Sequence, residues 1–413
     1  MPSRLSLMYS KILHLAQPFG TRVFSATMEV TTSEPNTTLT IAALAASYAT
    51  VIDWGDGSTD EITAEEAELA HEYVDAGTYT ITFPDAGAIT QFAYWDSGLT
   101  INSADIVHMS GLKRFEVYEI EGVFNTRDVR GWRPDTFIYE SSLGSVIVDS
   151  SDLVYWAPVY FDLSYTDNVS GRFDSADISH WRPQTFYFGR FLGEVSLSGR
   201  LDLGDMTDWR PNIFGVYAVK DENFAYILNS ADVADWRPTS FSLWQLGTHN
   251  NNLADTSGVF DSTDVANWNM QASEDVYASF DLDTLPSTVS VIVDFNHFNG
   301  WNLNNFTLRT TPHADVTVRT GVIPDWTYLR GFYMSGMGLS QTEVNTLLSE
   351  LYAQAQVRVS TGSAEVGLQT NTAPSGTHQA ACPPTTGKEF AYQLVNDTCS
   401  VITNPYTSVQ FDA

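Results

Sequence analysis

A motif that ends in tryptophan and proline recurs along the middle of the sequence. It reads FDSADISHWRP at residues 173–183, LDLGDMTDWRP at 201–211 and LNSADVADWRP at 228–238. The tryptophans of successive copies are Trp132, Trp156, Trp181, Trp209, Trp236, Trp268, Trp301 and Trp326. A degenerate copy before them has Met109 in the tryptophan position. About nine units of 23–33 residues predict a solenoid, because so short a unit cannot bury its own aromatic residues and must stack on its neighbours.

Each copy has the same order of residue types. An apolar residue is followed by Asn or Asp, then often by Ser, and an acidic residue follows two positions later. These recurring acidic residues are Asp128, Asp152, Asp177, Asp205, Asp232 and Asp264. The order predicts a short strand and then one capped helical or 3₁₀ turn, with the tryptophan packed beneath it. The proline after most tryptophans ends the turn, since it removes a backbone donor.

Residues 28–93 have a different pattern, in which short alternating strands are separated by turns. The stretches TTLTIAAL, VIDWGDGS and HEYVDAGTYTITF, which begin at residues 37, 51 and 71, predict a small β-sandwich. Eight residues match, in order, the hallmark motif of a known domain family, namely Trp54, Gly55, Asp56, Gly57, His71, Tyr73, Gly77 and Tyr79. This segment resembles the PKD family of immunoglobulin-like domains. The resemblance implies an extracellular or virion-surface spacer and binding module, not a catalyst.

Acidic residues in the turn of this segment have two interpretations. Asp53, Asp56 and Asp60 are candidate ligands for Ca²⁺, because that ion prefers hard oxygen donors. Alternatively, they only form the turn. The recurring aspartates of the repeat carry the same two interpretations, as Ca²⁺ ligands or as turn caps. No other cofactor is expected.

The repeat and the end of the chain each carry a further resemblance. The D-I-x-x-W core of units near 25 residues is similar to the BspA-like leucine-rich surface repeats, although RPDTF or RPQTFYF replaces the segment that usually continues that family's unit. Ser340 and Glu343 predict a capping box, followed by Val344, Leu347, Leu348 and Leu351 on one helical face. Helix, strand and turn there resemble the closing cap of leucine-rich solenoids.

These patterns divide the chain into four parts. Residues 1–27 are an N-terminal arm, 28–93 a PKD-like sandwich, 94–333 the solenoid and 334–413 the cap. The expected fold is mainly β, with an immunoglobulin-like sandwich, a leucine-rich-like solenoid with short helical turns, and a helix in the cap. Cys382 and Cys399, 17 positions apart, are candidates for a disulfide in this last part. Whether the arm anchors the protein, is disordered or is cleaved stays open.

The charge of the chain limits its partners. Asp and Glu number 50 against 20 Lys and Arg, which gives a formal net charge of -30. Nucleic acid is therefore not expected as a partner, because binding to it depends on cationic side chains. Anionic membrane surfaces are disfavoured for the same reason. No apolar run reaches 18 residues, so no membrane insertion is expected.

The sequence contains no strong catalytic signature. Its eight histidines are scattered, and no nucleophile elbow or phosphate loop occurs. The stretch FEVYEIEG brings Glu116, Glu119 and Glu121 close together on an expected strand, which is compatible with the paired carboxylates of a glycosidase or with a solvated strand face. Aromatic residues between the repeat cores are the better candidates for binding, and they include Tyr155, Tyr160, Tyr187, Tyr217 and Trp244.

We therefore expect a non-enzymatic protein of a bacteriophage virion surface, a tail, fibre or head-decoration component that presents the solenoid. Its expected partners are other virion proteins and a host-surface glycan or protein. The absence of a secretion or anchoring signal favours this hypothesis. A secreted or surface-exposed bacterial adhesin is the first alternative, and a glycan-cleaving tailspike-type enzyme is the second. Homo-oligomerisation stays open.

Overall fold

A computed structural model describes residues 24–411, apart from residues 192, 218, 220, 222, 245, 247–255, 311–315, 320–322, 324–325, 359–363, 370, 397–398, 400–401 and 403–404. The expected arm of residues 1–27 thus lies almost entirely outside the described residues. The chain is mainly β-structure, and its central part is a β-solenoid of about eight turns. The prediction of a solenoid from the repeat is confirmed.

Two parallel sheets form the solenoid, and each coil contributes one strand to each sheet. The outer sheet contains β10 (Val123–Asn125), β12 (Ser145–Asp149), β14 (Val169–Asp174), β16 (Val195–Asp202), β18 (Phe224–Ile227), β20 (Thr256–Asp261), β22 (Val289–Asp294) and β24 (Val316–Arg319). The inner sheet contains β9 (Arg114–Tyr118), β11 (Thr136–Glu140), β13 (Tyr160–Ser164), β15 (Thr185–Gly189), β17 (Ile213–Tyr217), β19 (Ser240–Trp244), β21 (Ser279–Leu285), β23 (Asn305–Thr310) and β25 (Gly331–Ser335).

The N-terminal strands form two groups that lead into the solenoid. One group is a sheet of β4 (Thr59–Ile62), β3 (Thr50–Asp53), β6 (Gly77–Phe83), β1 (Ala26–Thr32) and β8 (Leu99–Thr100). The other contains β5 (Ala67–Tyr73), β2 (Thr37–Ala46) and β7 (Ile89–Tyr94). Strand β7 pairs in parallel with β9, with Phe92 opposite Phe115. The inner sheet therefore continues without a break across the expected boundary at residue 93.

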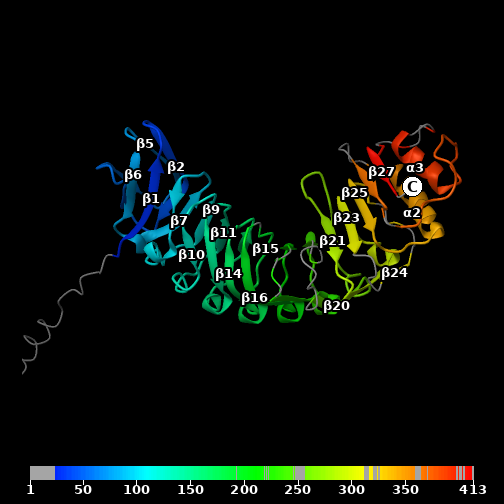
Figure 1. Cartoon of the computed structure of the whole chain (residues 1–413), viewed down its shortest axis with the longest axis horizontal. Coiled ribbons are helices and arrows are strands. Elements are labelled where there is room, and N and C mark those ends of the chain that lie inside the picture. The colour runs from blue at the N-terminus through cyan, green and yellow to red at the C-terminus, as the bar shows by residue number, and fades with distance from the viewer. Residues whose placement is uncertain are drawn as a thin grey trace, which may run out of the picture.

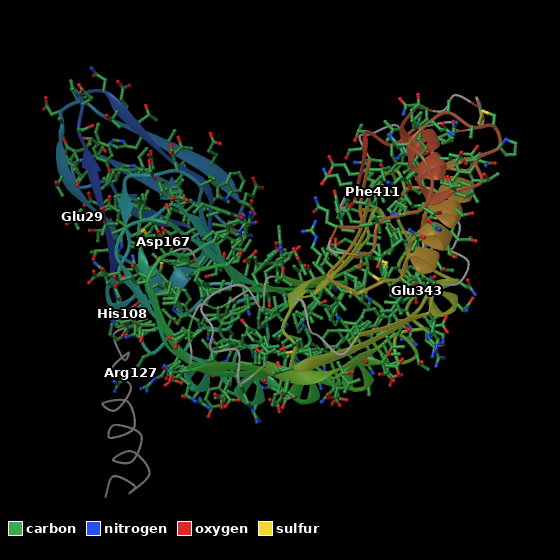
Figure 2. The ribbon with its side chains drawn as sticks, turned by 45° about the vertical axis from the view of Figure 1, so that its right-hand side comes forward. Glu29, His108, Arg127, Asp167, Glu343 and Phe411 are labelled. Atoms are coloured by element: carbon green, nitrogen blue, oxygen red, sulfur yellow. A yellow bond between two sulfur atoms is a disulfide. The ribbon has the colours of Figure 1, made fainter. Side chains whose placement is uncertain are left out.

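The stacked coils follow a curved path. The chain forms an open arc in which the inner sheet lies on the concave side, while the outer sheet and the short helical turns lie on the convex side (Figure 1). The same arc is seen after a 45° rotation (Figure 2). The outward side chains of the inner sheet therefore line the concave surface.

Phenylalanine fills the same inward position in strand after strand of the inner sheet. These residues are Phe92, Phe115, Phe137, Phe161, Phe186, Phe214, Phe241, Phe280, Phe306 and Phe332. Neighbouring rings lie 5.4–6.1 Å apart between centroids and are nearly parallel. This continuous stack, called the phenylalanine ladder below, joins the N-terminal strands to the last coil in one apolar core.

The repeat tryptophans pack against the phenylalanine ladder. All eight are buried, and each indole ring lies 5.0–5.4 Å from the phenylalanine ring of the preceding inner strand. Most of these contacts are edge-on or tilted, which suits the quadrupoles of aromatic rings. Each tryptophan thus fastens its own coil to the coil before it.

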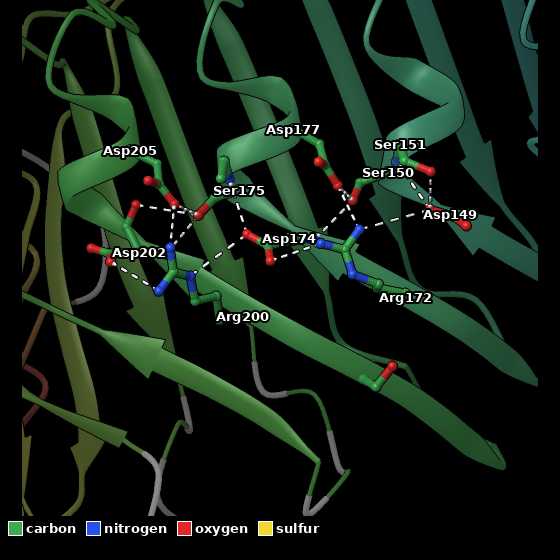
Figure 3. Close-up of polar contacts among 12 residues, drawn as sticks. Asp149, Ser150, Ser151, Arg172, Asp174, Ser175, Asp177, Arg200, Asp202 and Asp205 are labelled. Carbon is green, nitrogen blue, oxygen red and sulfur yellow. Dashed lines mark hydrogen bonds and ion pairs between the residues drawn. The ribbon is translucent and has the colours of Figure 1, made fainter.

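Short 3₁₀ turns on the convex side are joined by hydrogen bonds that run from coil to coil (Figure 3). In η3 (Ser150–Leu153), the Ser150 hydroxyl donates to Asp177 at 2.6 Å and accepts the backbone N–H of Asp174 at 2.9 Å. In η4 (Ser175–Ile178), Ser175 repeats both contacts with Asp205 and Asp202. A recurring aspartate therefore binds the serine of the preceding coil.

Arginines neutralise part of this row of carboxylates. Arg172 lies 2.7 Å from Asp177 and 2.9 Å from Asp174, and Arg200 lies 3.7 Å from Asp205. Figure 3 shows both guanidinium groups between successive aspartates. The carboxylates are thus engaged by serines and arginines of the chain.

Two helices cover the last coil. Helix α2 (Gln341–Ala355) begins with the predicted capping box of Ser340 and Glu343, which is confirmed, and it buries the four apolar residues of the predicted face. Helix α3 (Gly387–Asn396) follows, between the short strands β26 (Glu365–Gly367) and β27 (Ser408–Gln410) that extend the inner sheet. Cys382 and Cys399 form a disulfide beside α3.

Candidate functional site

The candidate site is built from the outward residues of the inner sheet. Side chains alternate along a strand, so the residues on either side of each inward phenylalanine point away from the core. Strand β21 illustrates this pattern, because Phe280 and Leu282 are buried while Ser279, Asp281 and Asp283 belong to the concave surface. The polar and aromatic side chains that differ from strand to strand therefore lie on the concave side of the sheet.

A groove of about 620 Å³ lies on this surface, across strands β15 to β25. Its lining consists of Tyr187, Ile213, Tyr217, Ser240, Ser242, Trp244, Tyr277, Ser279, Asp281, Asp283, Asn305, Thr307, Arg309 and Tyr333. This volume lies within the range of small-molecule binding sites. We call this feature the concave groove.

Aromatic rings form one end of the concave groove. Tyr187 and Tyr217 lie 6.4 Å apart and nearly parallel, and Trp244 lies 5.8 Å from Tyr217. The ring of Tyr187 covers Gly215, where a Cβ atom would lie 2.5 Å from the ring. Arg190 extends over the ring of Trp244 at 5.6 Å. The absence of a side chain at residue 215 leaves room for the ring of Tyr187.

Two tyrosines form the other end of the concave groove. The ring of Tyr333 lies against Gly367, where a Cβ atom would be 2.8 Å away, and its hydroxyl donates to Glu365 at 2.9 Å. Arg309 lies 4.8 Å from the centre of this ring. Tyr277 is 54% exposed, and its hydroxyl accepts a hydrogen bond from Asn305. These contacts hold the rings in place before any ligand arrives.

The floor between the two ends is polar. Asp283 is buried and forms an ion pair with Arg309 at 3.3 Å, and Thr284 donates to its second oxygen at 2.8 Å. Burial raises the pKa of Asp281, against the hydrogen bonds it receives from Thr307 and Ser279. The floor thus combines hydroxyl, carboxyl and guanidinium groups with little net charge.

A second polar cluster lies on the same face, nearer the N-terminus. Asp162 is only 4% exposed and is hydrogen-bonded to Glu140 and to Ser164. Burial raises the pKa of Asp162 to about 8, and the neighbouring Glu140 adds to this shift. Glu116 is held by Arg114 at 2.7 Å. Asp162 therefore keeps its proton at pH values where an ordinary aspartate is ionised.

The aromatic candidates from the sequence separate into two groups. Tyr187, Tyr217 and Trp244 come together in the concave groove. Tyr160 belongs to strand β13 of the same sheet but does not line the groove. Tyr155 lies outside the sheet, is 67% exposed and contacts Arg133.

The glutamates of FEVYEIEG do not lie on one strand, so this expectation was wrong. Strand β9 ends at Tyr118, and Glu119 has a φ of 49°, which turns the chain out of the sheet. Glu119 accepts a hydrogen bond from Ser142 at 2.6 Å. Only Glu116 remains in the strand, paired with Arg114.

The three turn aspartates use their carboxylates in separate contacts. Asp53 accepts the N–H of Gly55 at 2.9 Å, and Asp60 accepts the indole N–H of Trp54 at 2.8 Å. Asp56 binds Ser58 and His71, and although desolvation opposes them, these hydrogen bonds lower its pKa to about 2. Among the described residues, no group of three or more acidic, histidine or cysteine side chains is arranged to hold a metal ion.

Sequence reasoning missed most of the concave groove, since only Tyr187, Tyr217 and Trp244 of its lining were candidates. The missed residues include Tyr277, Asp281, Asp283, Asn305, Arg309 and Tyr333. A usable signal was present, because SFDLD, NFTLR and GFYMS alternate around a phenylalanine at residues 279–283, 305–309 and 331–335. Aligning these segments would have placed their outer residues side by side.

No protein-family model matches the sequence, and no curated protein does. No helix in the described part of the chain is both long and apolar enough to cross a bilayer.

Proposed function

We propose that this chain is a non-enzymatic surface protein of a bacteriophage virion, a tail, fibre or head-decoration component that binds the host surface through the concave groove. The observation that carries the binding role is the groove itself, in which five aromatic rings flank a polar floor. Aromatic side chains with few rotatable bonds are the usual anchors of binding surfaces.

A binding role suits the state of the carboxyl groups in the groove. Asp283 is held by Arg309 and Thr284, and Asp281 by Thr307 and Ser279. A catalytic pair would place one acid and one base on either side of a scissile bond. Here both carboxyl groups belong to one strand and are restrained by neighbours, which favours recognition over glycan cleavage.

In this proposal the remaining parts support the groove. The N-terminal strands act as a PKD-like spacer, and the repeats with their cap act as a leucine-rich-like scaffold. The phenylalanine ladder runs through both, so the spacer and the groove form one stiff body. Other virion proteins would bind outside the concave face.

A secreted or surface-exposed bacterial adhesin is the second candidate. The disulfide between Cys382 and Cys399 favours it, because disulfides persist in oxidising surroundings outside the cytoplasm. The adhesin would use the same concave groove, so the two candidates differ in location.

Mass spectrometry of purified phage particles and of the bacterial envelope separates these candidates. We expect peptides of this chain in the particles, at a constant ratio to other particle proteins. Peptides confined to the envelope would overturn the virion assignment and favour the adhesin.

A further inference from the structure

We infer that the concave groove binds a neutral oligosaccharide, with sugar rings stacked on the aromatic residues at its two ends. This inference rests on the proposed role of the groove in recognition and specifies its ligand.

The two ends of the groove present ring faces that suit sugars. The ring of Tyr187 lies against Gly215, and the ring of Tyr333 lies against Gly367. The C–H groups of a pyranose carry slight positive charge and pack well on the negative face of an aromatic ring. Five strand spacings separate β15 from β25, about 24 Å in all. A single sugar cannot reach both ends, so the ligand is an oligosaccharide.

The floor of the groove offers partners for hydroxyl groups. Asp281 and Asp283 provide carboxyl oxygens, Asn305 an amide and Arg309 a guanidinium. Such groups bind adjacent hydroxyls in pairs, and Asp283 and Arg309 are already fixed to each other at 3.3 Å. A ligand rich in hydroxyl groups can therefore replace water across the whole floor.

Charge argues for a neutral ligand. The chain has a formal net charge of -30, so an anionic glycan would be repelled by the protein as a whole. The arginine of the floor, Arg309, is already paired with Asp283. Nucleic acid is disfavoured on the same ground.

The sheet itself argues against a peptide. Peptides that bind sheets usually add a strand to a free edge, where backbone donors and acceptors are available. The groove lies on the face of strands that are paired on both sides, from β15 to β25. Its backbone groups are already bonded to neighbouring strands, so the ligand must be recognised by side chains.

The test is calorimetric titration of the full chain with six hexasaccharides. Four are neutral, namely cellohexaose, maltohexaose, mannohexaose and chitohexaose, and two are acidic, a hexagalacturonate and a hyaluronan hexamer. We expect binding of at least one neutral hexasaccharide. The variants Trp244→Ala and Tyr333→Ala, one at each end, should each weaken it at least tenfold. The inference is overturned if only acidic hexasaccharides bind or if none binds.

Tyr155→Ala is the matched control, because Tyr155 is an exposed aromatic residue outside the groove. It should bind like the wild-type chain, and an equal loss in this variant would contradict the assignment to the groove. Thermal midpoints of all three variants check that they are folded.

A second assay separates this inference from the proposed function. The labelled chain is added to bacterial cells that it binds. If all hexasaccharides fail but Trp244→Ala still abolishes cell binding, the ligand class is wrong and the recognition role stands. Cell binding that is insensitive to both groove variants would overturn the role of the groove as well.

Discussion

Asp162 carries an unusual charge state for a carboxyl group on the face of a sheet. It is buried beside Glu140, and its pKa is raised to about 8 from an ordinary value of 3.8. The folded chain therefore keeps a proton that the unfolded chain releases above pH 4. Folding binds a proton over this window, so the stability contributed by Asp162 falls as the pH rises through it.

The variant Asp162→Asn should remove this pH dependence. Asparagine does not titrate, and its carbonyl oxygen can still accept the hydrogen bond from Ser164. Relative to the wild-type chain, we expect the variant to gain at least about 1.4 kcal/mol of unfolding free energy between pH 5 and pH 8, the equivalent of one pKa unit. Denaturant titrations at both pH values measure this difference.

Asp235→Asn controls for the loss of one negative charge from an acidic chain, because the side chain of Asp235 is 81% exposed. It should change in parallel with the wild-type chain. Equal pH responses of the two variants would show that Asp162 is not protonated in the folded state.

At the residue scale, the sequence predicted the features that depend on the order of residues within one unit. The tryptophans and recurring aspartates could be found because their spacing within a unit is constant. Their partners could not, since Ser150 and Asp177 are 27 residues apart and units differ in length. The same limit applies to the groove, where Trp244 in β19 was a candidate but Asp281 in the neighbouring strand β21 was not.

At the scale of single elements, the outer strands depend on a glycine at one recurring position. Gly171 in β14 has a φ of 112°, and a Cβ atom there would overlap the carbonyl oxygen of Val148 in the preceding coil. Other glycines of the repeat, such as Gly199, are in the same situation. This explains why the outer strands have a glycine at this recurring position.

The substitution Gly171→Ala should destabilise the chain by about 2 kcal/mol or more, because it combines backbone strain with the overlap. Thermal unfolding followed by circular dichroism measures the loss. Gly131→Ala is the matched control, since a Cβ atom at Gly131 would have no neighbour within 4 Å. A loss of similar size in both variants would contradict the packing argument.

At the scale of single elements, one local sequence pattern also led to a wrong prediction. The alternation in FEVYEIEG predicted one long strand, yet the strand ends at Tyr118 because Glu119 adopts a left-handed conformation. Tyr165 and Arg190 have the same conformation just after β13 and β15. The inner strands are short because each coil must turn a corner there, which is a requirement of stacking and not of the local sequence.

At the scale of the whole molecule, the cap differs from the coils because the contacts that recur between coils do not stabilise it. Tyr406 donates to Gln354 at 2.9 Å, and Gln354 donates to the backbone carbonyl of Trp326 in the last coil. The disulfide between Cys382 and Cys399 lies in this cap. Its loss should therefore loosen the cap and leave the coils intact.

We expect Cys399→Ser to destabilise the cap by about 3 kcal/mol, the value for a closed loop of this size. Hydrogen exchange should become faster in α3 and stay unchanged in β15, which serves as the internal control. Faster exchange throughout the solenoid would show that the cap also holds the coils together.

The direction in which the strands are stacked has a mechanical consequence. The hydrogen bonds between strands run along the arc. A force that pulls the two ends of the molecule apart would therefore break the hydrogen bonds of one strand pair after another. One released repeat of 25 residues would lengthen the chain by about 80 Å. Under load, the protein would act as an extensible tether that yields one repeat at a time and recoils when the coils restack.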